Sequence, residues 1–415
     1  MARPLAAGAH HAGGDAPDGR NHPRGGDRRG DGGRVAVDEL TRWARDELAR
    51  LIEIPSPHGE EGAILEHLED RLEGLGRTPR RVEAGEAGWN LVVGPGSPEL
   101  VLVAHVDTIR PTWDWEPVAR VDGPRVQGLG AQDDKGGVAA LLVLLRLLGE
   151  DDLPESVAVA FTVDEEWGGR GSRAVAEALR PRAAVALEGT GGAVCTAEAG
   201  YAEAWVRFRG RGVHGSLIEE GDNAAVRAAR FVVDLPALPL AGAPAHPLLG
   251  RSVASVEELR AGGPIYAIPE RAEVRVDVRL SPPALPEEAF RQLRELAARH
   301  GGEVEPIEGA APFEVGTDVR LVRALRAAAR AVTGVQPPLG GMPSWTDAHS
   351  FVELAGADAV IYGPGHLRAA HRPDEWVDVR EVVTVGRVLA ELVRGWPRAA
   401  DAGAGRPGDR AREEV

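Results

Sequence analysis

Cysteine is almost absent from this sequence, since Cys195 is the only one in 415 residues. A single cysteine cannot form an intrachain disulfide framework, and it excludes a zinc site built from several cysteines. We expect Cys195 to be a buried, unreactive residue. Lysine is equally scarce: Lys135 is the only one, and arginine supplies all other positive side-chain charge.

The sequence also lacks features that direct a protein to a membrane, to secretion or to nucleic acid. It contains no low-charge apolar run long enough to span a bilayer, although 43% of its residues are hydrophobic. Its first residues are rich in Arg, Gly and Asp and include no apolar signal segment, so we expect a cytoplasmic protein. The net charge of −16 offers no basic face for phosphate groups, so neither nucleic acid nor a membrane is expected as a partner.

Length and patterning predict two folded domains between two unstructured ends. Single hydrophobic cores stop growing near roughly 250–300 residues, so a chain of 415 residues favours two domains. We expect a disordered extension over 1–34 and a flexible tail over 399–415, because both lack hydrophobic periodicity. A larger, discontinuous domain is predicted for 35–200 and 312–398, with a smaller domain inserted at 201–311.

In the larger domain, short apolar strand patterns alternate with helical patterns. This alternation predicts an α/β fold, with a mostly parallel sheet and helices on both of its faces. The inserted domain combines alternating strand patterns at 201–208 and 272–280 with helical patterns at 223–235 and 286–300. It therefore reads as a smaller α+β domain, and we expect its two patterned strands to leave an edge available for pairing.

Two pairs of polar residues stand where an apolar pattern begins or ends. One strand pattern ends in His105-x-Asp107, and alternation along a strand puts these two side chains on the same face. A metal-binding imidazole needs its second nitrogen held by a carboxylate or carbonyl, which Asp107 can supply. Asp133 and Asp134 come just before an apolar helical pattern, where they can cap the helix or hold a cation. A solvent-exposed strand end and a helix cap remain the simpler alternatives.

Further acidic residues and a histidine follow other strand patterns. Asp164, Glu165 and Glu166 are adjacent, and three such carboxylates repel one another unless solvent or cations compensate them. Glu188 ends another strand pattern, and His371 lies in a loop after a Gly-Pro-Gly turn. Each is compatible with an exposed turn. Together, these nitrogen and oxygen ligands at strand ends suit zinc or cobalt-like ions.

These motifs, in this order, resemble the metallopeptidase family of acetylornithine deacetylase, succinyl-diaminopimelate desuccinylase, aminoacylase-1 and carboxypeptidase G. The resemblance covers about residues 37–395 and includes the segments 54–61 and 363–375. It implies a zinc-exopeptidase-like fold in which the inserted domain serves as a lid and dimerisation domain. It also implies two divalent cations per chain, namely zinc, with cobalt or manganese as alternatives.

The resemblance implies roles for residues of the larger domain. Asp133 would bridge two ions, Glu165 would be the general base, and Asp107 would support a histidine ligand. The implied metal ligands are His105 and Glu188 for one ion, Glu166 and His371 for the other, and Asp133 for both.

Three residues of the inserted domain match further motifs of that family. The resemblance implies that His214 helps to stabilise an oxyanion across a dimer interface and that Arg279 binds the substrate carboxylate. Asn223 belongs to an Asn-Ala signature that we assign to substrate binding. Gly215 and Tyr266 depart from the residues usual in the family, which puts its familiar substrates in question.

The implied activity is hydrolysis of the amide bond of an N-acyl amino acid or a related small substrate that bears a carboxylate. A dipeptidase, a carboxypeptidase or a hydrolase of carbamoyl amides would use the same metal ligands, so these alternatives stay open. A catalytically inactive metal-binding regulatory module is the alternative outside enzymes, and the adjacent Glu165 and Glu166 argue against it. We expect a homodimer that forms through residues 201–311.

Overall fold

The computed structural model describes residues 29–149 and 153–396. Residues 1–28 of the predicted extension and the tail from residue 397 lie outside the described residues. Helix α1 (Arg29–Glu53) begins within the segment that the sequence assigns to the extension. A boundary between two compact units falls after Glu39, and the fold described below is that of the second unit. Among the described residues, no helix is both long and apolar enough to cross a membrane.

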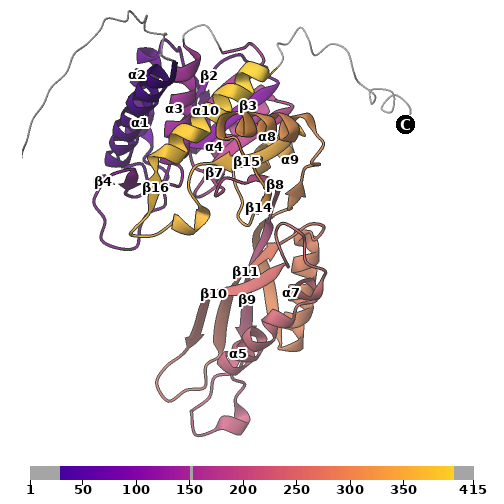
Figure 1. The fold of residues 1–415 in the computed structure, drawn as a ribbon. Coiled ribbons are helices and arrows are strands. Elements are labelled where there is room, and N and C mark those ends of the chain that lie inside the picture. Colours follow the sequence, from indigo (N-terminus) through magenta and orange to yellow (C-terminus); the bar gives the residue numbers. More distant parts are fainter. Residues whose placement is uncertain (1–28, 150–152, 397–415) are drawn as a thin grey trace, which may run out of the picture. The chain divides into compact units, whose positions relative to one another are not determined.

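A nine-stranded sheet forms the centre of the larger domain in the described part of the chain (Figure 1). Its four central strands run parallel, in the spatial order β6, β3, β7, β15. Every residue of β3, β6 and β7 is buried, which explains their continuous apolar sequences. The strands are β1 (Arg80–Glu83), β2 (Trp89–Val93), β3 (Leu100–His105), β6 (Val157–Thr162), β7 (Ala183–Gly189), β8 (Val194–Glu198), β13 (Phe313–Glu314), β14 (Leu339–Met342) and β15 (Asp358–Gly363).

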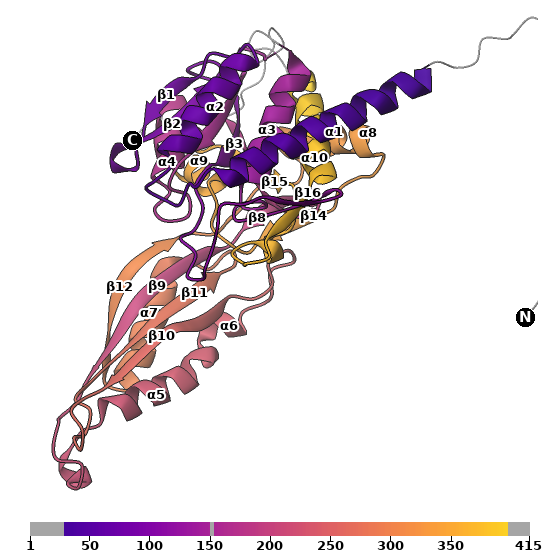
Figure 2. The same cartoon turned by 90° about the vertical axis from the view of Figure 1, so that its left-hand side faces the viewer.

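Helices cover both faces of this sheet, which confirms the predicted fold class. Helix α10 packs against α3 and α8 on one face, and α4 packs against α9 on the other (Figure 2). Twelve of the 14 residues of α3 are buried, so this helix is apolar on nearly all sides. The helices are α2 (Gly62–Gly74), α3 (Lys135–Leu148), α4 (Arg170–Leu179), α8 (Arg320–Thr333), α9 (Ala348–Ala355) and α10 (Val379–Gly395), with the short η1 (Gly85–Ala87) and η4 (Leu367–Ala369).

The inserted domain has an antiparallel sheet and a hydrophobic core of its own. Burial alternates along its strand β9, because one face of the sheet packs under the helices α5 and α7, which also contact each other (Figure 1). In spatial order, the strands are β10 (Val253–Gly262), β11 (Arg271–Leu280), β9 (Gly200–Arg209) and β12 (Gly302–Ala310). The helices are α5 (Ala224–Asp234), α6 (Pro239–Gly242) and α7 (Pro286–Arg299), with η2 (Ile218–Glu220) and η3 (Leu235–Ala237).

The prediction that the strands at 201–208 and 272–280 leave a free edge of the inserted sheet is wrong. The strand patterns at 201–208 and 272–280 correspond to β9 and β11, and each of these strands has a partner on both sides. The edges of the sheet are β10 and β12. Strand β10 is not predicted from the sequence, because most of its residues are exposed or only partly buried and no half-buried apolar pattern marks it.

A small three-stranded sheet connects two loops of the larger domain that are distant in sequence. It contains β4 (Arg120–Asp122), β5 (Arg125–Gln127) and β16 (Trp376–Asp378), with β5 in the middle. The antiparallel pairing of β5 with β16 sets Gln127 opposite Trp376. The loop after β5 therefore runs beside the loop that precedes β16.

Candidate metal centre

The candidate ligands gather where the parallel strands of the large sheet have their carboxyl ends. Strand β3 ends at His105, and Glu188 is the penultimate residue of β7. Glu166 follows β6, Asp133 lies just before α3, and His371 lies in the loop between β15 and β16. Parallel strands bring their carboxyl ends to one edge of a sheet, and this edge is where α/β proteins commonly form their sites.

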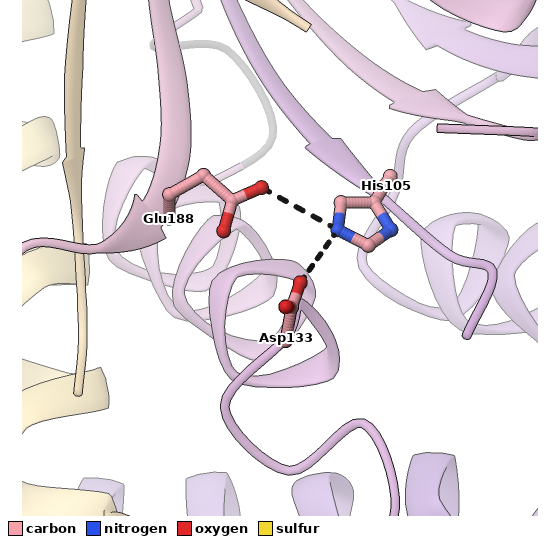
Figure 3. Close-up of side chains that lie close together, drawn as sticks. All are labelled: His105, Asp133 and Glu188. Carbon is pink, nitrogen blue, oxygen red and sulfur yellow. Dashed lines mark hydrogen bonds and ion pairs between the residues drawn. The ribbon is translucent and has the colours of Figure 1, made fainter. Parts of the chain in front are cut away.

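His105, Asp133 and Glu188 form the first group of possible metal ligands (Figure 3). The Nε2 atom of His105 lies 3.0 Å from Oδ1 of Asp133 and 3.5 Å from Oε1 of Glu188. All three residues are buried. The other ring nitrogen, Nδ1, lies 3.1 Å from the backbone carbonyl oxygen of Asp107. A proton on Nδ1 that is donated to this carbonyl leaves the Nε2 lone pair free for a cation.

Asp133, Glu166 and His371 form the second group. Nε2 of His371 lies 3.1 Å from a carboxylate oxygen of Glu166 and 3.3 Å from Oδ2 of Asp133. Asp133 thus presents Oδ1 to His105 and Oδ2 to His371. A carboxylate that offers one oxygen to each of two groups has the geometry of a bridge between two cations.

The carboxylates of this centre carry perturbed pKa values. Burial raises the pKa of Glu188 to about 8, and the nearby negative charge of Asp133 adds to the rise. Burial also raises the pKa of Glu166. For Asp133, burial acts in the same direction, but hydrogen bonds with His105 and His371 outweigh it and hold its pKa below the ordinary value. Divalent cations suit such a site, because they offset the mutual repulsion of buried carboxylates.

Asp107 and Glu165 lie beside these ligands. The carboxylate of Asp107 is fully buried and accepts hydrogen bonds from the backbone N–H groups of Glu165 (3.2 Å) and Glu166 (3.0 Å). Burial raises the pKa of Glu165 well above its ordinary value. Asp107 therefore contacts Nδ1 of His105 through its carbonyl oxygen and, at 3.4 Å, through Oδ1 of its carboxylate. The same carboxylate fixes the turn that carries Glu165.

A cavity of about 50 Å³ opens onto the centre. Its volume accommodates little more than a water molecule. The segment from Met342 to Thr346, to which the sequence assigned no role, forms part of the wall. The lining residues are Asp133, Glu165, Glu166, Glu188, Met342, Ser344, Trp345, Thr346, Leu367 and His371.

The sequence model of peptidase family M20/M25/M40 matches residues 101–395. This chain belongs to that family. The M20 protein is 32% identical to an acetylornithine deacetylase of Myxococcus xanthus over 357 residues, which are 80% of this chain and 91% of the relative. Its family membership makes it a metallohydrolase that acts on carbon–nitrogen bonds.

Solved structures agree with this assignment at the level of the fold. A tripeptidase from Staphylococcus aureus superposes on this chain with a TM-score of 0.72 at 20% identity. The comparison covers 85% of this chain and 98% of the tripeptidase. The YXEP protein of Bacillus subtilis, described as a dinuclear metal-binding peptidase of family M20, gives a TM-score of 0.63 at 18% identity. That comparison covers 86% of this chain and 98% of the other.

The three candidate residues of the inserted domain contact other residues of the same domain. Nδ1 of His214 lies 2.8 Å from the hydroxyl oxygen of Ser216, and the histidine is exposed. The side-chain oxygen of Asn223 accepts hydrogen bonds from the first turn of α5, so this residue is the N-cap of that helix. Nε of Arg279 donates to the carboxylate of Asp277 over 2.7 Å. Their roles toward substrate stay predictions.

The sequence motifs assigned no role to two buried charged residues near the centre, Lys135 and Glu375. Nζ of Lys135 donates a hydrogen bond of 2.8 Å to the carbonyl oxygen of Ile54, and burial lowers the pKa of this lysine to about 7. Glu375 accepts hydrogen bonds from the loop that carries Asp133. Each is a charged residue within a segment that the sequence predicts to be buried or tightly turned. This unusual placement of a charge is the signal that could have identified them.

Proposed function

We propose that this M20 hydrolase cleaves the amide bond of an N-acyl amino acid, or of a related small substrate that carries a carboxylate. The observation that carries the proposal is the position of Asp133, whose two oxygens face two separate ligand groups beside Glu165. A bridged pair of cations next to a carboxylate base is the arrangement required for metal-assisted amide hydrolysis.

The proposed cofactors are two divalent cations per chain. His105, Asp133 and Glu188 would hold one, and Asp133, Glu166 and His371 would hold the other. This mixture of imidazole nitrogens and carboxylate oxygens suits zinc, with cobalt or manganese as alternatives. When bound, such ions make water more acidic and polarise the scissile carbonyl.

The chain's own residues then handle the proton and the charges of the substrate. Glu165 would accept a proton from water at its carboxylate and transfer it to the leaving amine nitrogen. Asp107 would keep Glu165 in place, because it accepts the N–H group of that residue and of the next one. Arg279 would bind the substrate carboxylate through its planar guanidinium, and His214 would stabilise the developing oxyanion. Asn223 would contribute to the substrate-binding surface.

The N-acyl amino acid class is favoured because the Myxococcus xanthus relative, at 32% identity, is an acetylornithine deacetylase. Dipeptide or carboxypeptidase substrates are the second candidate, and the resemblance to the Staphylococcus aureus tripeptidase fold is compatible with them. The proposed compartment is the cytoplasm, which agrees with a chain that contains one cysteine.

The proposed assembly is a homodimer formed through residues 201–311. The exposed edge strand β10 supports it, since Val253 and Leu259 are 56% and 50% exposed on that strand. An edge strand offers unpaired backbone groups to a second copy. In such a dimer, His214 would serve the metal centre of the partner subunit.

A substrate panel tests the proposed activity. The protein is loaded with zinc, cobalt or manganese and assayed with N-acetylornithine, N-succinyl-diaminopimelate, N-acetylated neutral amino acids, dipeptides and N-carbamoyl amino acids. We expect hydrolysis of at least one N-acyl amino acid, abolished by a chelator and restored by metal. Cleavage of dipeptides alone would favour the second candidate. Full metal loading without hydrolysis of any member would contradict the proposed activity.

A further inference from the structure

Glu375 is a buried carboxylate at the end of the loop that carries His371, with an exposed fraction of 2%. It immediately precedes β16, whose Trp376 pairs with Gln127 at the end of β5. Because these strands are antiparallel, the chain that enters β16 lies beside the chain that leaves β5. The chain that leaves β5 continues to Asp133 and α3.

The carboxylate of Glu375 accepts three backbone hydrogen bonds from this second loop. Its Oε2 accepts from the N–H group of Gly130 at 3.0 Å, and its Oε1 accepts from Gln132 at 2.9 Å and from Asp133 at 3.1 Å. In addition, its backbone carbonyl oxygen accepts from Gly128 at 3.0 Å. One of these donors is thus the backbone N–H group of Asp133, the residue shared by both ligand groups.

An ionised carboxylate at position 375 fits these donors better than the neutral amide of a glutamine would. Both oxygens of Glu375 accept, and no donor is needed on either of them. A glutamine would turn an NH₂ group toward at least one backbone N–H group, because only one of its two terminal atoms is an acceptor. A buried N–H group without an acceptor is costly, so the loop would shift to find a new partner.

We propose that Glu375 is a positioning residue for the metal centre. By fixing the backbone from Gly130 to Asp133, it sets the direction of the Asp133 carboxylate toward His105 and His371. The loop that supplies His371 also supplies this anchor, so the two loops that meet at the second group of candidate ligands are held together. This inference rests on the proposed two-cation function.

The test compares Glu375→Gln with Glu381→Gln. Glu381 also accepts a backbone N–H group, from Gly365 at 2.9 Å, but it is exposed and accepts this bond from the loop that follows β15 rather than from the loop of Asp133. Zinc affinity is measured by competition with a chromogenic chelator. We expect Glu375→Gln to bind at least one zinc ion about 10–100-fold more weakly, with kcat reduced and KM nearly unchanged. Glu381→Gln should match the wild type, and excess zinc should restore part of the activity of Glu375→Gln.

Melting curves separate positioning from a purely structural role. A purely structural role would lower the melting temperature of the metal-free and metal-loaded forms equally, whereas positioning predicts a smaller metal-induced rise in Glu375→Gln. Should that variant fail to fold, Glu375→Asp keeps the charge on a shorter side chain and should bind zinc at least threefold more weakly. Wild-type zinc affinity in the folded variant overturns the proposal. A wild-type protein that binds no divalent cation would instead refute the proposed function.

Discussion

Asp107 and Glu166 are joined by a hydrogen bond of 3.0 Å from the backbone N–H group of Glu166 to the carboxylate of Asp107. A second bond, from the N–H group of Glu165, reaches the other oxygen of the same carboxylate at 3.2 Å. Asp107 also offers its carbonyl oxygen to Nδ1 of His105 at 3.1 Å. One residue therefore holds a candidate ligand of the first group, a candidate ligand of the second group and the candidate base.

Metal content is the most direct prediction. We expect elemental analysis of dialysed, zinc-loaded protein to approach two ions per chain, because Asp133 faces two ligand groups. Asp133→Asn should lower the content to one or fewer, since an amide offers one acceptor oxygen in place of two. A folded wild-type protein that never exceeds one ion would contradict the shared site.

Replacing the candidate base should separate proton transfer from binding. Glu165→Gln keeps the shape of the side chain but cannot accept a proton from water. We expect kcat to fall by about 10²–10⁴-fold while metal content and KM stay close to wild type. Steady-state kinetics with metal analysis of the same preparation check this. A variant that retains more than about a tenth of the wild-type rate would rule out the assigned role.

Asp107→Asn should affect catalysis through the turn that carries Glu165. The asparagine NH₂ group would face one of the two backbone N–H groups that Asp107 now accepts. We expect kcat to fall by about 10–100-fold. Asp114→Asn, at an exposed position outside the centre, is the control and should retain wild-type kinetics. Equal rates for the two variants would show that the turn needs no such anchor.

Subunit mixing tests the proposed dimer. His214→Ala and Glu165→Gln chains should each be inactive alone. If His214 serves the partner's centre, a mixed dimer has one site with both defects and one with neither. Activity should then recover toward one intact site per mixed dimer after subunit exchange. Demonstrated exchange without recovery would mean that His214 does not act across the interface.

An ion pair away from the centre gives a prediction for stability. Glu47 on α1 is buried and accepts a hydrogen bond of 2.9 Å from Nε of Arg71 on α2. Burial raises its pKa, but hydrogen bonds with His67 and Arg71 outweigh burial and lower the pKa below 4.5. A lowered folded-state pKa means that the stabilisation is complete above the ordinary pKa and is lost as the pH falls through the folded-state pKa.

Glu47→Gln should therefore lower the free energy of unfolding at pH 7 by about 1–3 kcal/mol. The difference from the wild type should shrink as the pH falls below 4.5, the ordinary pKa of this group. Denaturant titrations at several pH values measure it. Glu73→Gln, at an exposed position on α2, should show no comparable loss at any pH. A loss for Glu47→Gln that does not change with pH would exclude the ion pair as its cause.

The sequence alone determined the fold class and the set of candidate ligands. Buried parallel strands such as β3 and β7 are continuous apolar runs, and their ends are marked by His105 and Glu188. Parallel strands bring their carboxyl ends to one edge, so polar residues that follow separate strand patterns could be expected to meet. Local patterns suffice for this inference, because each strand and its last residue are continuous in the sequence.

Only the tertiary structure decided which atoms face each other and what holds them. Asp107 contacts His105 through both its carbonyl oxygen and its carboxylate, and this depends on backbone geometry that no residue pattern encodes. The anchor at Glu375 depends on the pairing of β5 with β16, two three-residue strands that are distant in the chain. Strand β10 stayed hidden because an exposed edge strand needs no apolar alternation. Such features arise from long-range backbone pairing, which short segments do not specify until the rest of the fold brings them together.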